Sequence, residues 1–359
     1  MEKLLGFLAP ALICLLILVL NAVLPGRWVN GYITRPGTSE KMRYHLNGIN
    51  VFVTLILAWF LLGYFNIMPF DWLYIYRWYG LAGACLTGII FSLAMVLPYP
   101  RVRKNLAADL FFGRAENIQF FGGKVDVKMW LYLTGATMLE LNVLSFFSHH
   151  RILFGDDASA GIFLTSVLIT WFVTDYLIFE EVHLYTYDLF AERVGFKLGW
   201  GCIVFYPYFY AISLWSTVEL PHPKTPDWLF VVFAALFFAG WGLSRGANMQ
   251  KYFYKKYPGR SFLGIVPGSI TDGNRSLLVN GFWGTSRHIN YLGEILEATG
   301  IILCTGYPML IWPWLYPLYY VALLFTRQAD DDRRCAKKYG DLWKKYVKMV
   351  PYRIIPYVY

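Results

Sequence analysis

The sequence has little charge, and its few cysteines form no recognisable pattern. Only 15% of its 359 residues are charged, whereas 57% are hydrophobic and 19% aromatic, which excludes an ordinary soluble domain. The five cysteines lack a CxxC pair or a His-rich spacing, which argues against a disulfide framework and a structural zinc site. No Gly/Ser linker, low-complexity tract or obvious repeat is present. These absences favour one membrane domain over a soluble module on an anchor.

Apolar runs long enough to cross a bilayer recur along the chain. A helical crossing needs about 20 mostly apolar residues. We expect the first run to be an uncleaved span, because it lacks a clear small-x-small cleavage site. The sequence predicts an all-α, polytopic transmembrane helix bundle of about nine or ten spans. The nine runs that we delimit are 4–24, 48–66, 79–98, 129–147, 160–179, 201–217, 227–244, 289–305 and 307–326.

The net charge of +9 is carried mainly by loops that alternate with these spans. Three Lys/Arg-rich segments fall on one side, namely the loops 100–128 and 245–288 and the C-terminal tail, so that side is expected to be cytosolic. Positive cytosolic loops explain the charge without a nucleic-acid partner. From residue 245 onward, polar, basic and aromatic residues surround two short apolar spans, which predicts a pocket at the cytosolic face.

Two dense polar segments carry the candidate chemistry. The first, 277–293, contains Arg-His-Ile-Asn-Tyr at 287–291; the second, 327–340, is followed by Tyr346 and by Pro-Tyr-Arg-Ile-Ile-Pro at 351–356. Their Arg, Lys, Asn, Asp and Tyr side chains can clamp a phosphorylated ligand through charge-assisted hydrogen bonds. No GxGxxG motif follows a predicted strand, so a nucleotide site here would not be of the Rossmann type.

Together with the predicted loop around Gln250 and Lys251, these motifs resemble the sterol reductase family, which includes Δ7-, Δ14- and Δ24(24¹)-sterol reductases. The resemblance covers about residues 110–359. It implies one membrane domain over 1–359, with generic spans in 1–110, sterol-side spans in 111–244 and an NADPH-binding part in 245–359. The implied activity is NADPH-dependent reduction of a sterol carbon–carbon double bond.

The same resemblance implies which residues hold NADPH. The family's basic pair falls on Lys251 and Lys255. The family more often has Lys followed by Arg there, so the second position keeps its charge but loses the planar guanidinium. The other cofactor-lining positions are Leu278, Trp283, Asn290, Tyr291, Arg327, Asp331, Cys335, Ala336, Lys337, Lys338, Tyr339 and Tyr346.

An isolated alkene accepts hydride poorly, so reduction is expected to begin with protonation to a tertiary carbocation, which hydride then quenches. This chemistry needs a proton donor and an electron-rich pocket. The expected donors are Tyr346 and Asp331, with Glu140 and Asp175 as intramembrane candidates. Aromatic faces stabilise a cation by about 0.5–2 kcal/mol each. The cluster that could do so is Tyr206, Tyr208, Phe209 and Tyr210.

The position of the reduced bond stays open between Δ7, Δ14 and Δ24(24¹). Leu-Gly-Trp-Gly at 198–201 is most similar to the Δ7 branch, whereas Ile-Pro-Tyr-Val-Tyr at 355–359 resembles the Δ24(24¹) branch. At 113–119 the chain has Gly-Arg-Ala-Glu-Asn-Ile-Gln, where the family usually has Gly-Arg-x-Leu-Asn-Pro-Arg. The departure leaves the substrate geometry near this loop open.

Two other functions remain as alternatives. Isoprenylcysteine carboxyl methyltransferases bind S-adenosylmethionine through a related arrangement with Arg-His-Pro-x-Tyr, but residue 289 here is Ile. A non-catalytic sterol-binding membrane protein is the other alternative. We expect a sterol and the bilayer as partners and no metal, since His149 and His150 lack a third ligand and suit a solvated loop. The membrane would be the endoplasmic reticulum in a eukaryote or the inner membrane in a bacterium.

Overall fold

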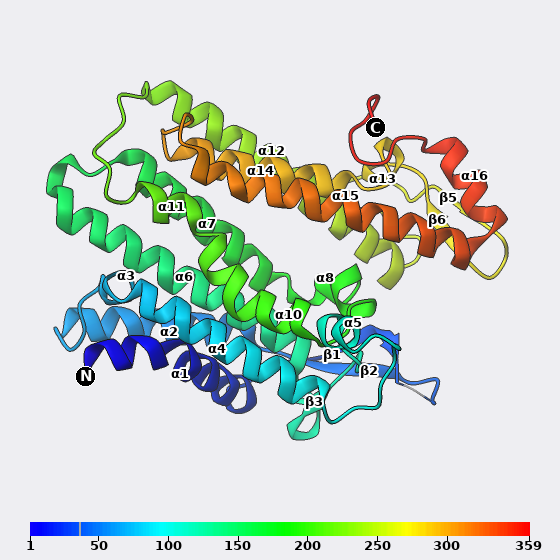
Figure 1. Ribbon diagram of the computed structural model, residues 1–359. Helices are drawn as coiled ribbons and strands as arrows, with labels where there is room; N and C mark the ends of the chain where they lie inside the picture. Colours follow the sequence, from blue (N-terminus) through cyan, green and yellow to red (C-terminus); the bar gives the residue numbers. More distant parts are fainter. Residues whose placement is uncertain (36) are drawn as a thin grey trace. The chain divides into compact units, whose positions relative to one another are not determined.

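The computed structural model describes residues 1–35 and 37–359, and its contacts divide the chain into two compact units (Figure 1). Unit 1 comprises Met1–Pro223 and unit 2 comprises Lys224–Tyr359. The proposed pocket residues from 245 onward all belong to unit 2. The predicted division at 110/111 and 244/245 stays a prediction.

Unit 1 is built around the long helix α6, which packs against helices α1, α2 and α7 and against a π-helical segment, η3. Asp126 starts α6 by accepting hydrogen bonds from the amides of Lys128 and Met129, which satisfies donors that have no partner inside the helix. The helices of the unit are α1 Glu2–Val23, α2 Gly48–Tyr64, α3 Trp72–Ile75, α4 Arg77–Val96, α5 Leu106–Phe112, η1 Phe121–Gly123, α6 Val127–Phe154, η2 Gly155–Asp157, α7 Ala160–Ile178, α8 Glu180–His183, α9 Tyr187–Phe190, α10 Phe196–Trp200, η3 Gly201–Phe209 and α11 Ile212–Thr217.

A β-hairpin that the sequence analysis did not predict joins α1 to α2. Strands β1 (Arg27–Thr34) and β2 (Lys41–Leu46) pair in antiparallel fashion. Alternate residues of β2, namely Met42, Tyr44 and Leu46, are buried in a small apolar cluster. This period of two is the signal that could have revealed the strand. A second, shorter pair, β3 (Gln119–Phe120) with β4 (Val125–Asp126), precedes α6.

Two loops of unit 1 are tied together at Gly113 and Gly195. A Cβ atom on Gly195 would lie 2.2 Å from the amide nitrogen of Gly113, so the two backbones approach too closely for any side chain. Ala115 and Val194 form a bridge beside this contact, and Arg193 pairs with Glu116 at 2.7 Å. The Glu116 of the altered family motif therefore has a structural partner within the same unit.

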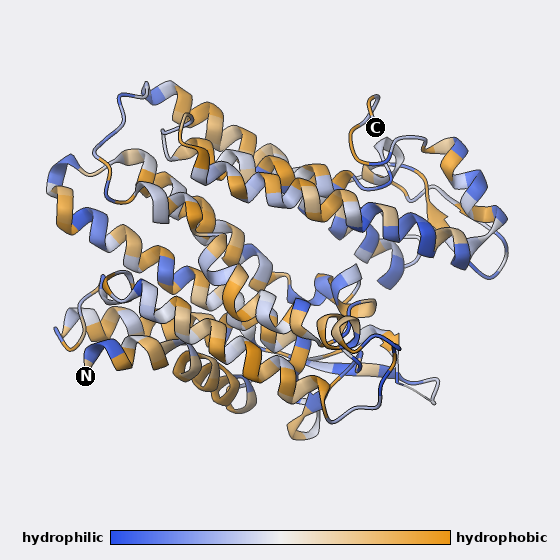
Figure 2. Cartoon of the chain, in the orientation of Figure 1, coloured by the Kyte–Doolittle hydropathy of each residue, from blue (hydrophilic) through white to orange (hydrophobic). Residues whose placement is uncertain are grey.

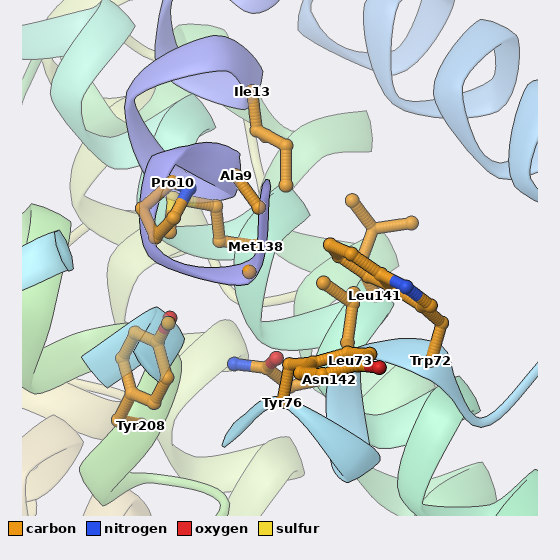
Figure 3. A pocket seen from close by; sticks show the side chains of 12 residues that line it. Ala9, Pro10, Ile13, Trp72, Leu73, Tyr76, Met138, Leu141, Asn142 and Tyr208 are labelled. Atoms are coloured by element: carbon orange, nitrogen blue, oxygen red, sulfur yellow. The ribbon is translucent and has the colours of Figure 1, made fainter. Parts of the chain in front are cut away.

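A small pocket lies between α1, α3, α4, α6 and η3 of unit 1 (Figure 3). Its walls include Met138, Asn142 and Tyr208, and its volume is about 10 Å³. A cavity needs a volume of about 10–15 Å³ to hold one water molecule. The cavity is thus too small for a sterol, and Tyr208 lines a water-sized space.

Unit 2 contains three long helices, α12 (Asp227–Lys256), α14 (Ile289–Cys304) and α15 (Ile311–Tyr339), which lie side by side (Figure 1). Helices α12 and α14 cross closely at glycines: a Cβ atom on Gly293 would lie 2.6 Å from the carbonyl oxygen of Gly240. Small residues allow such close contact between membrane helices. The remaining elements are β5 Ser269–Thr271, β6 Ser276–Leu278, α13 Phe282–Thr285 and α16 Asp341–Met349.

Five of the described helices are long and apolar enough to cross a membrane: α1, α4, α7, the 196–217 segment and α12. Helix α2 is apolar but shorter, with 17 residues. Figure 2 shows apolar residues along most of the helices and hydrophilic residues gathered on α16 and the end of α15. The protein is therefore a multi-pass membrane protein, and the predicted all-α fold class is confirmed.

Two local predictions were wrong. Gln250 and Lys251 were expected in a loop, but α12 continues to Lys256, because polar helix-forming residues can extend a helix beyond the bilayer. Its 30 residues reach about 45 Å, against a hydrocarbon core of about 30 Å. His149 and His150 were expected in a solvated loop, but both lie in α6, where His149 contacts Asp71 at 3.0 Å. His150 is fully buried and lies 2.7 Å from the Val218 carbonyl oxygen.

Candidate active site

The end of α12, helix α13 and helix α16 meet at Trp283. The indole nitrogen of Trp283 donates a hydrogen bond of 2.8 Å to the carbonyl oxygen of Ala247. Its own carbonyl oxygen accepts one of 3.3 Å from the Tyr346 hydroxyl. The Lys251 ammonium lies 5.5 Å from the centre of the Trp283 ring, within cation–π range. Three predicted cofactor residues, Lys251, Trp283 and Tyr346, therefore share one place.

The segment before Trp283 is fixed by Gln250, which the sequence analysis did not assign to the site. The buried side-chain amide of Gln250 accepts a hydrogen bond of 3.0 Å from the Phe282 amide and donates one of 3.2 Å to the Asn280 carbonyl. Gly281, between these two residues, has φ +63°, which glycine adopts at little cost. Gln250 thus orients the turn that presents Trp283.

Asp331 and Tyr291 form a second predicted pair. The Tyr291 hydroxyl donates a hydrogen bond of 2.8 Å to Oδ2 of Asp331. Burial raises the pKa of Asp331 above its usual value, against the lowering influence of His288, Tyr291, Lys251 and Arg327. A raised pKa keeps a carboxyl protonated more readily, which suits a proton donor.

The neighbouring Asp332, which the sequence analysis did not single out, behaves in the opposite way. Burial alone would raise its pKa, but His288 and Arg287 outweigh that effect and hold the pKa below its usual value. Arg287 contacts Oδ2 of Asp332 at 3.2 Å, and Gln328 donates a hydrogen bond of 2.8 Å to the same oxygen. Two carboxyls whose surroundings separate their pKa values commonly take different roles. The lowered pKa of Asp332 favours its ionised form.

The buried face of α16 forms the centre of an apolar cluster. Its buried members are Tyr339, Leu342, Trp343, Tyr346 and Val350, and Cys335 packs against it. Burial raises the pKa of the Cys335 thiol to about 11, so the thiol stays protonated and is a poor nucleophile at neutral pH. Leu278 is buried in β6. These predicted residues supply packing surface.

The remaining predicted residues are more peripheral. Ala336, Lys337 and Lys338 are exposed along α15, and the Lys338 ammonium lies 5.1 Å from the centre of the Tyr339 ring. The Lys255 ammonium lies 5.5 Å from the ring of its neighbour Tyr254. Arg327 acts on both Tyr291 and Asp331 through its charge. Lys255 and Lys337 therefore have no contact with Trp283 or Asp331 among those that the described residues make.

Several buried polar atoms near Asp331 have no hydrogen-bond partner within residues 1–35 and 37–359. They are Nε of Arg287, Nε2 of His288, Oδ1 of Asn290 and Oδ1 of Asp332. Such groups are costly unless water or a ligand satisfies them. The buried Oδ1 of Asn290 is an acceptor that suits an amide or hydroxyl donor, both of which NADPH carries. The residues present therefore fit a polar ligand that carries hydrogen-bond donors.

A groove of about 710 Å³ lies next to the Trp283 turn, within the range of ligand pockets. Phe282, Ile289 and Leu292 form one wall, and the C-terminal segment contributes Met349 and Tyr352. Its lining residues carry no charged side chain. The groove is thus apolar, in contrast to the polar cluster around Asp331.

Comparison with known proteins assigns the chain to a family. The model of the ergosterol biosynthesis ERG4/ERG24 family matches residues 5–359. The Delta(14)-sterol reductase of Arabidopsis thaliana is 31% identical, covering 99% of this chain and 98% of that protein. The Delta(14)-sterol reductase erg24 of Schizosaccharomyces pombe is 34% identical over 71% of this chain and 59% of that protein.

A bacterial relative extends the comparison beyond eukaryotes. The Delta(14)-sterol reductase of Methylotuvimicrobium alcaliphilum is 30% identical, covering 93% of this chain and 79% of that protein. The match spans both compact units, so it is not confined to the C-terminal motifs. The chain therefore belongs to the ergosterol biosynthesis ERG4/ERG24 family of sterol reductases, and it is an oxidoreductase that acts on carbon–carbon double bonds.

Proposed function

We propose that the protein reduces the Δ14 double bond of a sterol with NADPH, and that the cofactor is held by unit 2. The choice of Δ14 over Δ7 and Δ24(24¹) rests on the names of its relatives, each called Delta(14)-sterol reductase. The observation that carries the proposed chemistry is the hydrogen bond of 2.8 Å from Tyr291 to Asp331.

In this proposal, Lys251, Arg327 and Asn290 bind the cofactor, and Trp283 orients it. Lys251 and Arg327 supply positive charge beside Asp331, and the buried Oδ1 of Asn290 accepts a hydrogen bond from the ligand. NADPH, when bound, supplies the hydride for the reduction. Tyr346 supports Trp283 through its carbonyl oxygen, which makes Tyr346 a positioning residue in this scheme.

Asp331 is the proposed proton donor. The carboxyl gives its proton to one alkene carbon, the π bond breaks, and the adjacent carbon becomes cationic until it receives hydride with its electron pair. The Asp331 carboxylate that remains accepts the Tyr291 hydrogen bond, which stabilises its charge. Tyr346 was the other expected donor, but its hydroxyl hydrogen is directed to a carbonyl, which favours Asp331.

The experiment that tests the activity uses purified protein, NADPH and a panel of Δ7, Δ14 and Δ24 sterols, with the products identified by mass spectrometry. We expect conversion of the Δ14 substrate alone. Conversion of another sterol would overturn the assigned bond position, and no saturated product from any sterol would overturn the proposed reductase activity.

A ligand-binding experiment separates this proposal from the methyltransferase alternative. A ligand present at 100 times its Kd stabilises a folded protein by about 2.7 kcal/mol. NADPH should therefore raise the melting temperature in detergent, whereas S-adenosylmethionine should not. The reverse result would favour a methyltransferase.

A further inference from the structure

Two successive aspartates of α15 contact two stacked rings at the start of α14: that of His288, which precedes the helix, and that of Tyr291, which lies in its first turn. The Tyr291 hydroxyl donates its hydrogen bond to Asp331 at 2.8 Å, while Nε2 of His288 lies 3.5 Å from Oδ1 of Asp332. The His288 and Tyr291 rings are stacked, with centroids 5.0 Å apart and planes inclined by 15°. The Tyr291 ring thus contacts Asp331 through its hydroxyl and stacks on the His288 ring, which in turn contacts Asp332.

The backbone of His288 is held by two hydrogen bonds, and both rings are buried. The His288 amide donates a hydrogen bond of 2.8 Å to the Arg353 carbonyl oxygen, and its own carbonyl oxygen accepts one of 2.9 Å from the Tyr291 amide. His288 is 7% exposed and Tyr291 is 5% exposed. Neither ring can therefore rotate into solvent. Because the two rings are in close contact, a shift in the position of one ring displaces the other.

Asp332 is held more firmly than the contact with His288 requires. Its Oδ2 atom accepts from Arg287 at 3.2 Å and from Gln328 at 2.8 Å. Arg287 also donates to the carbonyl oxygens of Val350 and Pro351 at 2.9 and 2.8 Å. The Oδ1 atom of Asp332 accepts no hydrogen bond within the described part of the chain, and Nε2 of His288 lies 3.5 Å from it, within ion-pair distance.

We infer that His288 and Asp332 are positioning residues for the proposed proton donor: Asp332 fixes the His288 ring, and the stacked Tyr291 ring is thereby aimed at Asp331. This inference rests on the proposed function, because it assigns the donor role to Asp331. A small rotation of Tyr291 would lengthen its hydrogen bond to Asp331. Misplacement by about 1 Å can cost a reaction up to about a hundredfold in rate.

The test compares the variants Asp332→Asn and His288→Phe with the wild-type enzyme. Asp332→Asn removes the charge that orients the imidazole, and His288→Phe keeps a stacking ring without a nitrogen. For both we expect kcat to fall about ten- to a hundredfold, with a shifted pH profile of kcat and an NADPH Kd that changes less than about threefold. Asp332→Glu should restore part of kcat. Asp330→Asn is the matched control, since Asp330 pairs with Arg333 and Arg334.

A spectroscopic arm keeps this inference distinct from the proposed function. With 3-fluorotyrosine at position 291, the ¹⁹F shift should change in Asp332→Asn and remain unchanged in Asp330→Asn, whether or not a sterol is reduced. Unchanged kcat, pH profile and ¹⁹F shift in Asp332→Asn would overturn the positioning role. If Asp332→Asn fails to fold, the same readouts on His288→Gln and His288→Phe decide, and wild-type values in both would reject the role.

Discussion

The Tyr346 hydroxyl donates a hydrogen bond to the backbone carbonyl of Trp283, whose indole donates in turn to the carbonyl of Ala247. Helices α16, α13 and α12 are joined through these two bonds. Tyr346→Phe removes the first bond, which is worth about 0.5–1.5 kcal/mol. We expect weaker NADPH binding and a lower melting temperature, with kcat reduced less than about tenfold, measured by steady-state kinetics and thermal unfolding.

The opposite kinetic pattern would reassign the donor. A general acid contributes about 10²–10⁴ in rate, so a loss of that size in Tyr346→Phe, at unchanged NADPH affinity, would make Tyr346 the proton source. Tyr352→Phe serves as the control, because Tyr352 lines the neighbouring groove and belongs to the same C-terminal part.

Asp331→Asn should lower kcat by about 10²–10⁴. Burial raises the pKa of Asp331, and the active form is the protonated one. Wild-type kcat should therefore decline as pH rises through that raised pKa, and the decline should be absent from the residual activity of the variant. The pH profile of kcat measures both effects. Asp330→Asn should keep the wild-type profile, and a variant Asp331→Asn with normal turnover would disprove the assignment.

Glu180 should make the stability of unit 1 depend on pH. Burial raises the pKa of this carboxyl to about 7, although the Gly48 amide and Arg27 lower it in part. The folded state then binds a proton more tightly than the unfolded state, whose pKa is near 4.5. Its stabilising contribution is complete below pH 4.5 and is lost as pH rises through 7.

Removing this carboxyl should flatten the pH dependence. We expect the difference in melting temperature between wild type and Glu180→Gln to change steadily from pH 4.5 to pH 7 and to level off above it. Glu40→Gln, at an exposed position next to β2, should track the wild type across the range. Parallel curves for wild type and Glu180→Gln would refute the prediction.

Substitution of Gly293 should separate α12 from α14. A Cβ atom at this position would lie 2.5 Å from the Ser244 amide nitrogen and 2.6 Å from the Gly240 carbonyl oxygen, and backbone atoms cannot rotate away. Gly293→Ala should therefore destabilise the protein by about 1–3 kcal/mol, measured as thermal unfolding in detergent.

Gly242, on the partner helix α12, offers a control of the opposite sign. No heavy atom lies within 4 Å of a Cβ built there, and replacing a helical glycine by alanine adds about 0.5–1 kcal/mol of stability. Gly242→Ala should thus raise the melting temperature slightly. Equal effects of Gly242→Ala and Gly293→Ala would contradict the close helix crossing.

The helices could be predicted from sequence because the length of an apolar run is a local signal. The predicted runs 4–24 and 160–179 match Glu2–Val23 and Ala160–Ile178 within two residues. Helix ends outside the bilayer could not be placed this way: the run predicted to end at 326 belongs to a helix that continues to Tyr339. Beyond the apolar part, helix length depends on packing and on capping residues.

The candidate site was predictable in its residue types but not in its pairings. The motif resemblance selected Tyr291 and Asp331, which the structure joins by a hydrogen bond. It did not select Asp332 or Gln328, because which of two adjacent carboxyls faces Tyr291 depends on the rotation of α15 about its axis. That rotation is set by contacts with α14 and with Arg287, which no local pattern encodes.

Because Asp331 and Asp332 are adjacent and have different partners, the number of residues that precede them in α15 determines which partner each carboxylate reaches. Each residue turns an α-helix by about 100°, so one residue inserted between Ile311 and Asp330 would turn Asp331 to the direction that Asp332 now has and Asp332 to the direction of Arg333. Substitution of one apolar residue by another in this stretch would keep the directions of the two carboxylates, whereas a single insertion or deletion would change them.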